Sequence, residues 1–324
     1  MHLRYMCTLK WIKGSILYGC SRSFFLTATM KKALNIDEQI ALLKSRGMTI
    51  ADEAKAAEVL LDIGYYRLGF YWYPFEVHPQ QGKPRHHQFL HGTTFDDAVR
   101  LYYFDRDLRN IVVNVTGRIE VNFRTALIYH GSIAYRNDPT WFATPSVVGD
   151  DFLSKIDSIY GDIRRNDVIM RHHKRYPSDK YAPAWKTLEF LAQGQANILF
   201  NSLKDDALKE TIVARYGLRP GIFSRYINVV RIVRNRCAHG HYLYNFHPAQ
   251  SIPNSSFLHL DGHNNDVVGC LMVVDRLLGC VSASRSLEFR SQVQALVKNP
   301  KNATILPHTS HLLAVVKGRQ DGGE

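Results

Sequence analysis

Residues 94–127 read TFDDAVRLYYFDRDLRNIVVNVTGRIEVNFRTAL, and this stretch decides the fold class. Apolar side chains recur along it at intervals of three and four residues, from Val99 to Leu127. This spacing places them on one stripe of an α-helix. Thr94 followed three residues later by Asp97 is typical of a helix N-terminus. We therefore expect one long helix here, with an apolar face to bury.

Charged side chains occupy the other face of this expected helix. Asp105 and Arg109 are four residues apart, as are Glu120 and Arg124, and this is the usual spacing of ion pairs on a helix surface. We expect both pairs to be solvated. Arg118 and Arg124 also allow a second interpretation, in which they frame a phosphate of RNA.

The same periodicity continues on both sides of residues 94–127. Helical patterns cover residues 36–46, 49–64, 152–176, 183–200, 206–216, 220–239, 265–283 and 285–298. In the second of these, Thr49 with Asp52 resembles an N-cap and its partner. Strong two-residue alternation is absent, so we expect an all-α multi-helix bundle with an additional N-terminal helical region.

We expect the chain to be organised around a loop at residues 136–149, which contains Asn137-Asp138-Pro139 and Pro145. The predicted parts are an upstream extension of the reading frame at 1–29, helical parts at 30–135 and 150–298, and a tail at 299–324.

Composition indicates a globular protein with a polyanionic partner. The 324 residues carry a formal net charge of +12, with 45% hydrophobic and 22% charged residues. Five cysteines without a C-x-x-C pair indicate neither a disulfide framework nor a zinc site, and they fit a reducing cytoplasm. No window reaches the roughly 18 apolar residues of a membrane helix. We expect no metal, no cofactor and no membrane.

Residues 64–75, GYYRLGFYWYPF, are densely aromatic. Their rings have two interpretations. They pack in the core, or they form a platform on which unpaired bases stack, since aromatic faces beside an arginine suit single-stranded RNA.

Residues 231–245, RIVRNRCAHGHYLYN, carry the candidate chemistry. Arg234 is a fixed cation, His239 titrates near neutral pH, and Asn235 can orient either one. These groups can cleave RNA without a metal. On an ideal helix, however, side chains five residues apart point about 140° apart. Either the helix ends near Gly240 and swings the histidine round, or a second subunit completes the site.

Arg234-Asn235-x-x-x-His239 resembles the R-x4-6-H signature of HEPN ribonucleases. Other segments of the chain resemble the Abi-like family of abortive infection proteins, of the AbiD/AbiF type, and occur in the same order. Those segments are residues 42–48, 63–68, 89–95, 103–109, 119–124 and 234–239. The resemblance extends over about residues 33–250.

The resemblance implies a HEPN-type bundle and metal-independent endonucleolytic cleavage of RNA, in bacterial phage defence or as a toxin. In such a mechanism His239 acts as acid or base, Arg234 holds the phosphate, and Asn235 orients one of them. The residues expected to line the RNA cleft are Arg231, Arg236, His241, Tyr242, Tyr244 and Asn245. A homodimer and an antitoxin-like RNA or protein are the expected partners.

Two other classes of function remain open at this point. The chain could be a non-catalytic RNA-binding protein that holds a small structured RNA. It could also be a helical protein-interaction subunit, in which Arg234 caps helix-end carbonyls and His239 is an ordinary surface residue.

Overall fold

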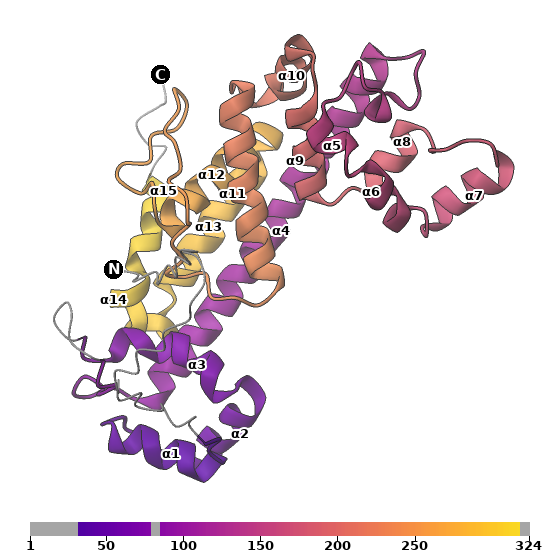
Figure 1. Cartoon of the computed structure of the whole chain (residues 1–324). Helices are drawn as coiled ribbons and strands as arrows, with labels where there is room; N and C mark the ends of the chain where they lie inside the picture. The colour runs from indigo at the N-terminus through magenta and orange to yellow at the C-terminus, as the bar shows by residue number, and fades with distance from the viewer. Residues whose placement is uncertain (1–31, 79–84, 318–324) are drawn as a thin grey trace, which may run out of the picture. The chain divides into compact units, whose positions relative to one another are not determined.

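The structure is a computed structural model, and it describes residues 32–78 and 85–317 (Figure 1). The chain divides into a unit of residues 1–35 and a unit of residues 36–324, and every helix described belongs to the second unit. Within the described ranges there are isolated β-bridges but no strand. The all-α prediction is therefore confirmed. The extension predicted at 1–29 lies outside the described residues.

The helices fall into three stretches of the chain. The N-terminal stretch contains α1 Ile36–Ser45, α2 Glu53–Ile63, α3 Tyr65–Trp72 and α4 Phe95–Ala134. The middle stretch contains α5 Asp150–Leu153, α6 Ile156–Ile163, α7 Asp167–Arg175, α8 Ala184–Thr187, α9 Gln193–Ser202 and α10 Asp206–Val213. The C-terminal stretch contains α11 Pro220–Ala238, α12 Val267–Val281, α13 Ala283–Lys298, the 3-10 helix η5 Pro300–Ile305, α14 Leu306–Thr309 and α15 Ala314–Lys317.

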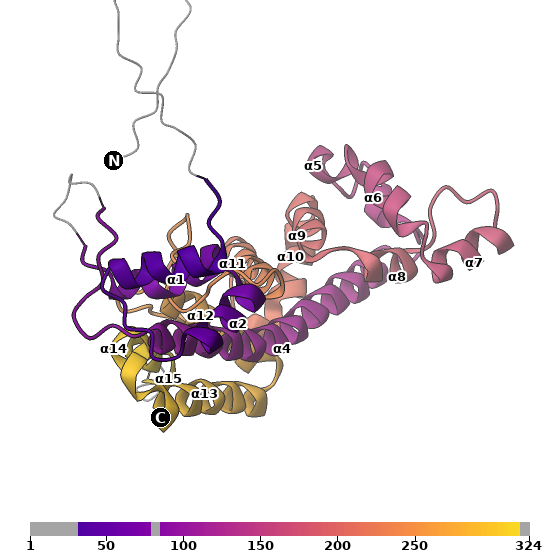
Figure 2. The same ribbon diagram turned by 90° about the horizontal axis from the view of Figure 1, so that it is seen from below.

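Helix α4 is the element on which the others pack. It is 40 residues long, and Thr94 and Asp97 cap its start reciprocally, as the sequence predicts. It contacts α3 near one end and α8 and α9 near the other, and α10 to α13 pack along it (Figures 1 and 2). Its apolar stripe is fully buried at Leu108, Ile119 and Phe123.

Three predicted helix details are wrong. The cap of α2 is Asp52, whose carboxylate accepts a hydrogen bond from the backbone N–H of Lys55, and not Thr49. The pattern at 152–176 is not one helix but α5, α6 and α7, and the pattern at 183–200 is not one helix but α8, the 3-10 helix η3 Leu188–Phe190 and α9. Asn166 starts α7 afresh because its side chain accepts from the N–H of Val168, an interaction that competes with helix continuation.

The stretch after α13 packs on the bundle in its described part. Residues 300–317 form short helices that contact α12 and α13 and bury Ile305 and Leu312. Through Tyr244 and His311 this stretch also reaches the segment that follows α11.

Candidate active site

Helix α11 carries the R-N-x-x-x-H segment, residues 234–239. Proline at its first position suits a helix start because no backbone donor is lost there. A buried stripe attaches the helix to α4, α9 and α12, and it consists of Phe223, Tyr226, Ile227, Val229, Val230, Val233 and Cys237. The helix is therefore fixed along one face, and Arg234 and His239 are exposed.

Helix α11 ends at Ala238, and His239 is its C-cap. The backbone N–H of His239 still donates to the Asn235 carbonyl, at 2.9 Å, with φ −90°. Gly240 has φ +68°, a left-handed conformation that terminates helices, and the His241 N–H then donates to the Arg236 carbonyl. The backbone thus leaves the helix at the His239 cap. On an ideal helix, side chains five residues apart point about 140° apart, and the His239 N–H keeps its helical hydrogen bond.

Arg234 is held toward α4 by Glu120. The side chain is 44% exposed, and its Nε lies 3.9 Å from Glu120 Oε2. The other carboxylate oxygen accepts from Arg124 Nη2 at 2.7 Å. The Glu120–Arg124 pair is confirmed, but it is only 14% and 15% exposed, so the expectation that it is solvated is wrong. Arg234 of α11 lies beside it. Arg118 on the same helix is exposed.

Asn235 accepts a hydrogen bond from Arg234 Nη1 at 3.3 Å, and so contacts the arginine of the segment. His239 is exposed, and its ring centroid lies 6.3 Å from that of His241, which is exposed as well. The structure therefore presents two imidazoles together at the helix end, while Arg234 lies on the side of the same helix.

Other residues expected in the RNA cleft hold the local fold. The Arg236 guanidinium donates twice to the Tyr242 carbonyl and lies over the rings of Tyr242 and Phe246. Tyr244 is buried, and burial raises the pKa of its hydroxyl. Asn245 is exposed.

Arg231 lies apart from these residues. It donates to the Asn228 side chain and lines a different cavity, formed with residues 248–253. The structure thus brings Arg236, His241 and Tyr242 together, and it leaves Arg231 outside this group.

Asp105 is a residue whose role the sequence reasoning missed. It is fully buried and accepts from Leu243 N at 2.8 Å, Tyr244 N at 2.7 Å, Tyr71 Oη at 2.8 Å and Arg109 Nε at 3.2 Å. The ion pair with Arg109 is confirmed, but the expectation that it is solvated is wrong. We call Asp105 with these four donors the Asp105 clamp.

Burial raises the pKa of the Asp105 carboxyl, while the hydrogen bonds of the clamp and the Arg109 charge oppose that rise. The clamp spans α4 and the segment after α11, because a buried carboxylate must be satisfied by donors close to it. It therefore sets where the chain goes immediately beyond His241.

A residue of α3 also holds the end of α11 in place. Arg67 Nη1 donates to the Gly240 carbonyl at 2.9 Å. A Cβ added at Gly240 would lie 3.0 Å from Arg67 Nη1 and 3.5 Å from Arg109 Nη1. Arg67, Asp105 and Arg109 stand in two of the segments quoted for the family resemblance, 63–68 and 103–109. Their place inside these segments is the signal in the sequence that points to the three residues.

A groove opens beside this helix end, with a volume of about 340 Å3. It lies between α3 and the end of α11, and we call it the aromatic groove. Its lining residues are Tyr66, Arg67, Phe70, Tyr71, Arg236, Gly240, His241 and Tyr242.

A family model described as "Abi-like protein" matches residues 58–245. The chain belongs to the Abi-like protein family. The matched range contains α3, the Asp105 clamp and the R-N-x-x-x-H segment. Comparisons with curated proteins and with solved structures give no match.

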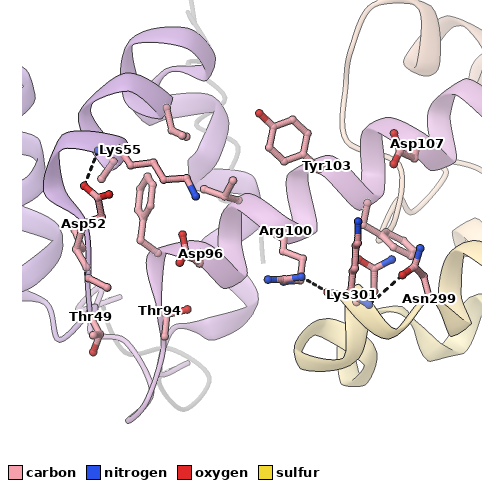
Figure 3. A pocket seen from close by; sticks show the side chains of 18 of the residues that line it. Thr49, Asp52, Lys55, Thr94, Asp96, Arg100, Tyr103, Asp107, Asn299 and Lys301 are labelled. Carbon is pink, nitrogen blue, oxygen red and sulfur yellow. Dashed lines mark hydrogen bonds between the residues drawn. The ribbon is translucent and has the colours of Figure 1, made fainter.

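This Abi-like protein has another cavity, of about 510 Å3, between α2, the start of α4 and η5 (Figure 3). Its charged side chains are of both signs: Asp52, Asp96 and Asp107 face it together with Lys55, Arg100 and Lys301. No residue of 231–245 lines it. Despite its larger volume, it is the weaker candidate, because no histidine lines it, although Phe95, Tyr103 and Phe104 do.

Within the described ranges of the Abi-like protein, His, Cys, Asp and Glu residues form no group of three or more placed to hold a metal ion. No helix between residues 32 and 317, leaving aside 79–84, is both long and apolar enough to cross a bilayer.

Proposed function

We propose that this protein is a metal-independent endoribonuclease of the HEPN superfamily, of the AbiD/AbiF type, that acts in abortive infection of bacterial cells by phage. Membership of the Abi-like family supports the role in defence. The observation that carries the enzymatic part is the exposed R-N-x-x-x-H segment at the fastened end of α11, with Arg234 and His239 both open to a substrate.

The reaction needs one base, one acid and one cation. The ribose 2′ oxygen forms a bond to phosphorus, and the bond from phosphorus to the 5′ oxygen breaks, which leaves a 2′,3′-cyclic phosphate and a 5′ hydroxyl. His239 takes the 2′ proton or delivers a proton to the 5′ oxygen, the two roles that histidine most often fills in acid–base catalysis. Arg234 offsets the charge of the phosphorane with paired N–H donors.

A homodimer is part of this proposal. The angle of about 140° keeps Arg234 and His239 of one helix from converging on one phosphate. In a symmetric dimer the same patch of each subunit faces its copy, so two α11 helices can bring an arginine of one to a histidine of the other. Such a dimer, in the cytoplasm, would be restrained by an antitoxin-like RNA or protein.

The test is cleavage of total RNA by the purified full chain in excess chelator. We expect His239→Ala and Arg234→Ala each to slow cleavage by about 100-fold or more, the range of general acid–base and charge-stabilising groups. Matched controls are His259→Ala and Arg225→Ala, since both side chains are exposed and Arg225 lies on α11. Both controls should cleave at the wild-type rate.

Wild-type speed in the His239→Ala variant would overturn the nuclease assignment. RNA that copurifies uncut, whether or not the two residues are present, would instead support a non-catalytic RNA-binding protein.

A further inference from the structure

The aromatic groove exposes rings that a folded protein normally buries. The Tyr66 side chain is 83% exposed and Phe70 is 41% exposed, on consecutive turns of α3. Tyr242, across the groove, stacks on Phe70 with centroids 5.2 Å apart and planes at 28°. Large apolar faces open to water in a concave site are typical of ligand recognition.

These rings stand on a rigid support. Tyr66 meets Phe70 edge to face at 5.6 Å, and Tyr242 is 6.4 Å from Tyr244. Tyr244 is in turn buried, stacks on Tyr71 at 5.9 Å, and has its backbone N–H fixed by Asp105. Because Phe70 and Tyr242 are held in place before any ligand arrives, little side-chain entropy is lost at these two rings on binding.

Cations and the R-N-x-x-x-H segment border the groove. Arg67 is exposed and uses one of its five N–H donors on the Gly240 carbonyl. Arg236 lies over the Tyr242 ring at 4.9 Å. Gly240 and His241 line the groove and directly follow His239 in the chain. An occupant of the groove therefore lies beside the histidine.

We propose that the aromatic groove binds one unpaired base of single-stranded RNA, next to the phosphate that His239 acts on. This inference rests on the proposed nuclease function and names its substrate class. A groove of about 340 Å3 is at the lower end of small-ligand pockets, which span roughly 300–1,000 Å3, so it suits a base and not a duplex. Bases stacked inside a helix do not present their faces, whereas splayed bases do.

The charge of the chain favours this occupant over an apolar peptide. The net charge is +12, and the groove has arginines at its border and no carboxylate in its lining. Aromatic faces combined with cations are the recurring means of holding single strands without strict sequence preference.

The test uses the full chain with His239→Ala, so that RNA stays intact, and measures the affinity for a labelled single-stranded oligonucleotide and for the same sequence as a duplex. Tyr66→Ala should weaken single-strand binding by roughly 5- to 100-fold, the effect of losing one base–aromatic stack. Tyr66→Trp should retain binding. Tyr129→Ala is the matched control, because Tyr129 is an exposed tyrosine on α4.

Salt dependence separates stacking from phosphate binding. Tyr66→Ala should leave the slope of log Kd against log salt unchanged, whereas Arg67→Ala should lower it, because only a cation releases counterions from the phosphates. Duplex affinity should be the same in Tyr66→Ala and its parent.

The inference is overturned if Tyr66→Ala binds the single strand as tightly as its parent, if single strand and duplex weaken equally, or if neither binds at all. It is also overturned if Tyr66→Ala only changes the oligomeric state, which would make the groove a contact between copies. Failure of the nuclease proposal looks different: wild-type protein would then leave RNA uncut while Tyr66→Ala still weakened its binding.

Discussion

Two ion pairs on α4 have the same spacing and different surroundings. Asp105 and Arg109 are buried, and the carboxylate also holds the backbone of the segment after α11. Glu120 and Arg124 lie four turns further along the helix and are partly exposed. The contact from Glu120 to Arg234 is long, at 3.9 Å. The two pairs differ in burial because different segments of the chain pack on them.

The contrast has a consequence for the candidate active site. Beyond His239 the chain is fixed by two buried hydrogen bonds to Asp105, which are costly to remove, and by an exposed hydrogen bond from Arg67. Arg234 has one long ionic contact and remains 44% exposed. A fixed histidine end with an adjustable arginine suits a site in which the cation must move onto an arriving phosphate.

The largest effect should come from breaking the clamp. Asp105→Ala leaves the Arg109 cation and two backbone N–H groups buried without their acceptor, and loss of one partner of a buried pair costs about 3–5 kcal/mol. The free energy of unfolding in urea should fall by that amount. Asp107→Ala, an exposed carboxylate two residues away, should change it by less than about 0.5 kcal/mol. Equal losses in both variants would refute the clamp.

The second effect concerns the end of α11. Gly240→Ala places a Cβ at φ +68° and close to Arg67, and a left-handed conformation costs an L-residue about 1–2 kcal/mol. Gly117→Ala is the counterpart on α4, where nothing lies within 4 Å of the added Cβ and the helix should gain about 0.5–1 kcal/mol. The midpoint of thermal unfolding should fall for Gly240→Ala and rise for Gly117→Ala. A shift of the same sign in both variants would contradict this.

A smaller effect is expected at the partly exposed pair. Glu120→Ala removes the acceptor of Arg124 and the contact to Arg234, and exposed or partly exposed pairs contribute about 1 kcal/mol or less. Urea unfolding should show a loss well below that of Asp105→Ala. If the free energy of unfolding falls as much as in Asp105→Ala, the two pairs stabilise the fold equally and the contrast between them is wrong.

The smallest effect is pH dependence at His311, whose Nε2 donates to the Tyr244 carbonyl on the clamped segment. Burial lowers its pKa, so the unfolded chain takes up the proton first as the pH falls below about 6.5, and stability is lost there. His311→Gln keeps a donor without titrating. The variant should lose less stability than wild type between pH 7.5 and pH 5.5, measured by urea unfolding; an equal loss would exclude this role.

The sequence predicts what is local and leaves open what is not. The start of α4 follows from Thr94 and Asp97, and the position of α11 from its apolar spacing, because caps and stripes involve neighbours in the chain. Asp105 could not be assigned in this way. Its partner Leu243 is 138 residues distant, and a spacing of four is the same for a solvated pair and a buried one.

The candidate site shows the same division. Arg234, Asn235 and His239 come directly from the sequence. Tyr242 and Tyr244 look equivalent in the chain, yet one lines the aromatic groove and the other is buried behind it. Only the packing of α3 against the segment after α11 separates them.

Complementation between inactive subunits tests most directly whether Arg234 and His239 act together across a dimer. Arg234→Ala and His239→Ala chains are coexpressed, purified and assayed on total RNA with chelator. Random pairing gives half mixed dimers with one intact site each, so about a quarter of wild-type cleavage should return. If the mixture stays as inactive as each variant alone, the two residues do not form a site across subunits, and if either variant alone cleaves at the wild-type rate, the proposed chemistry is wrong.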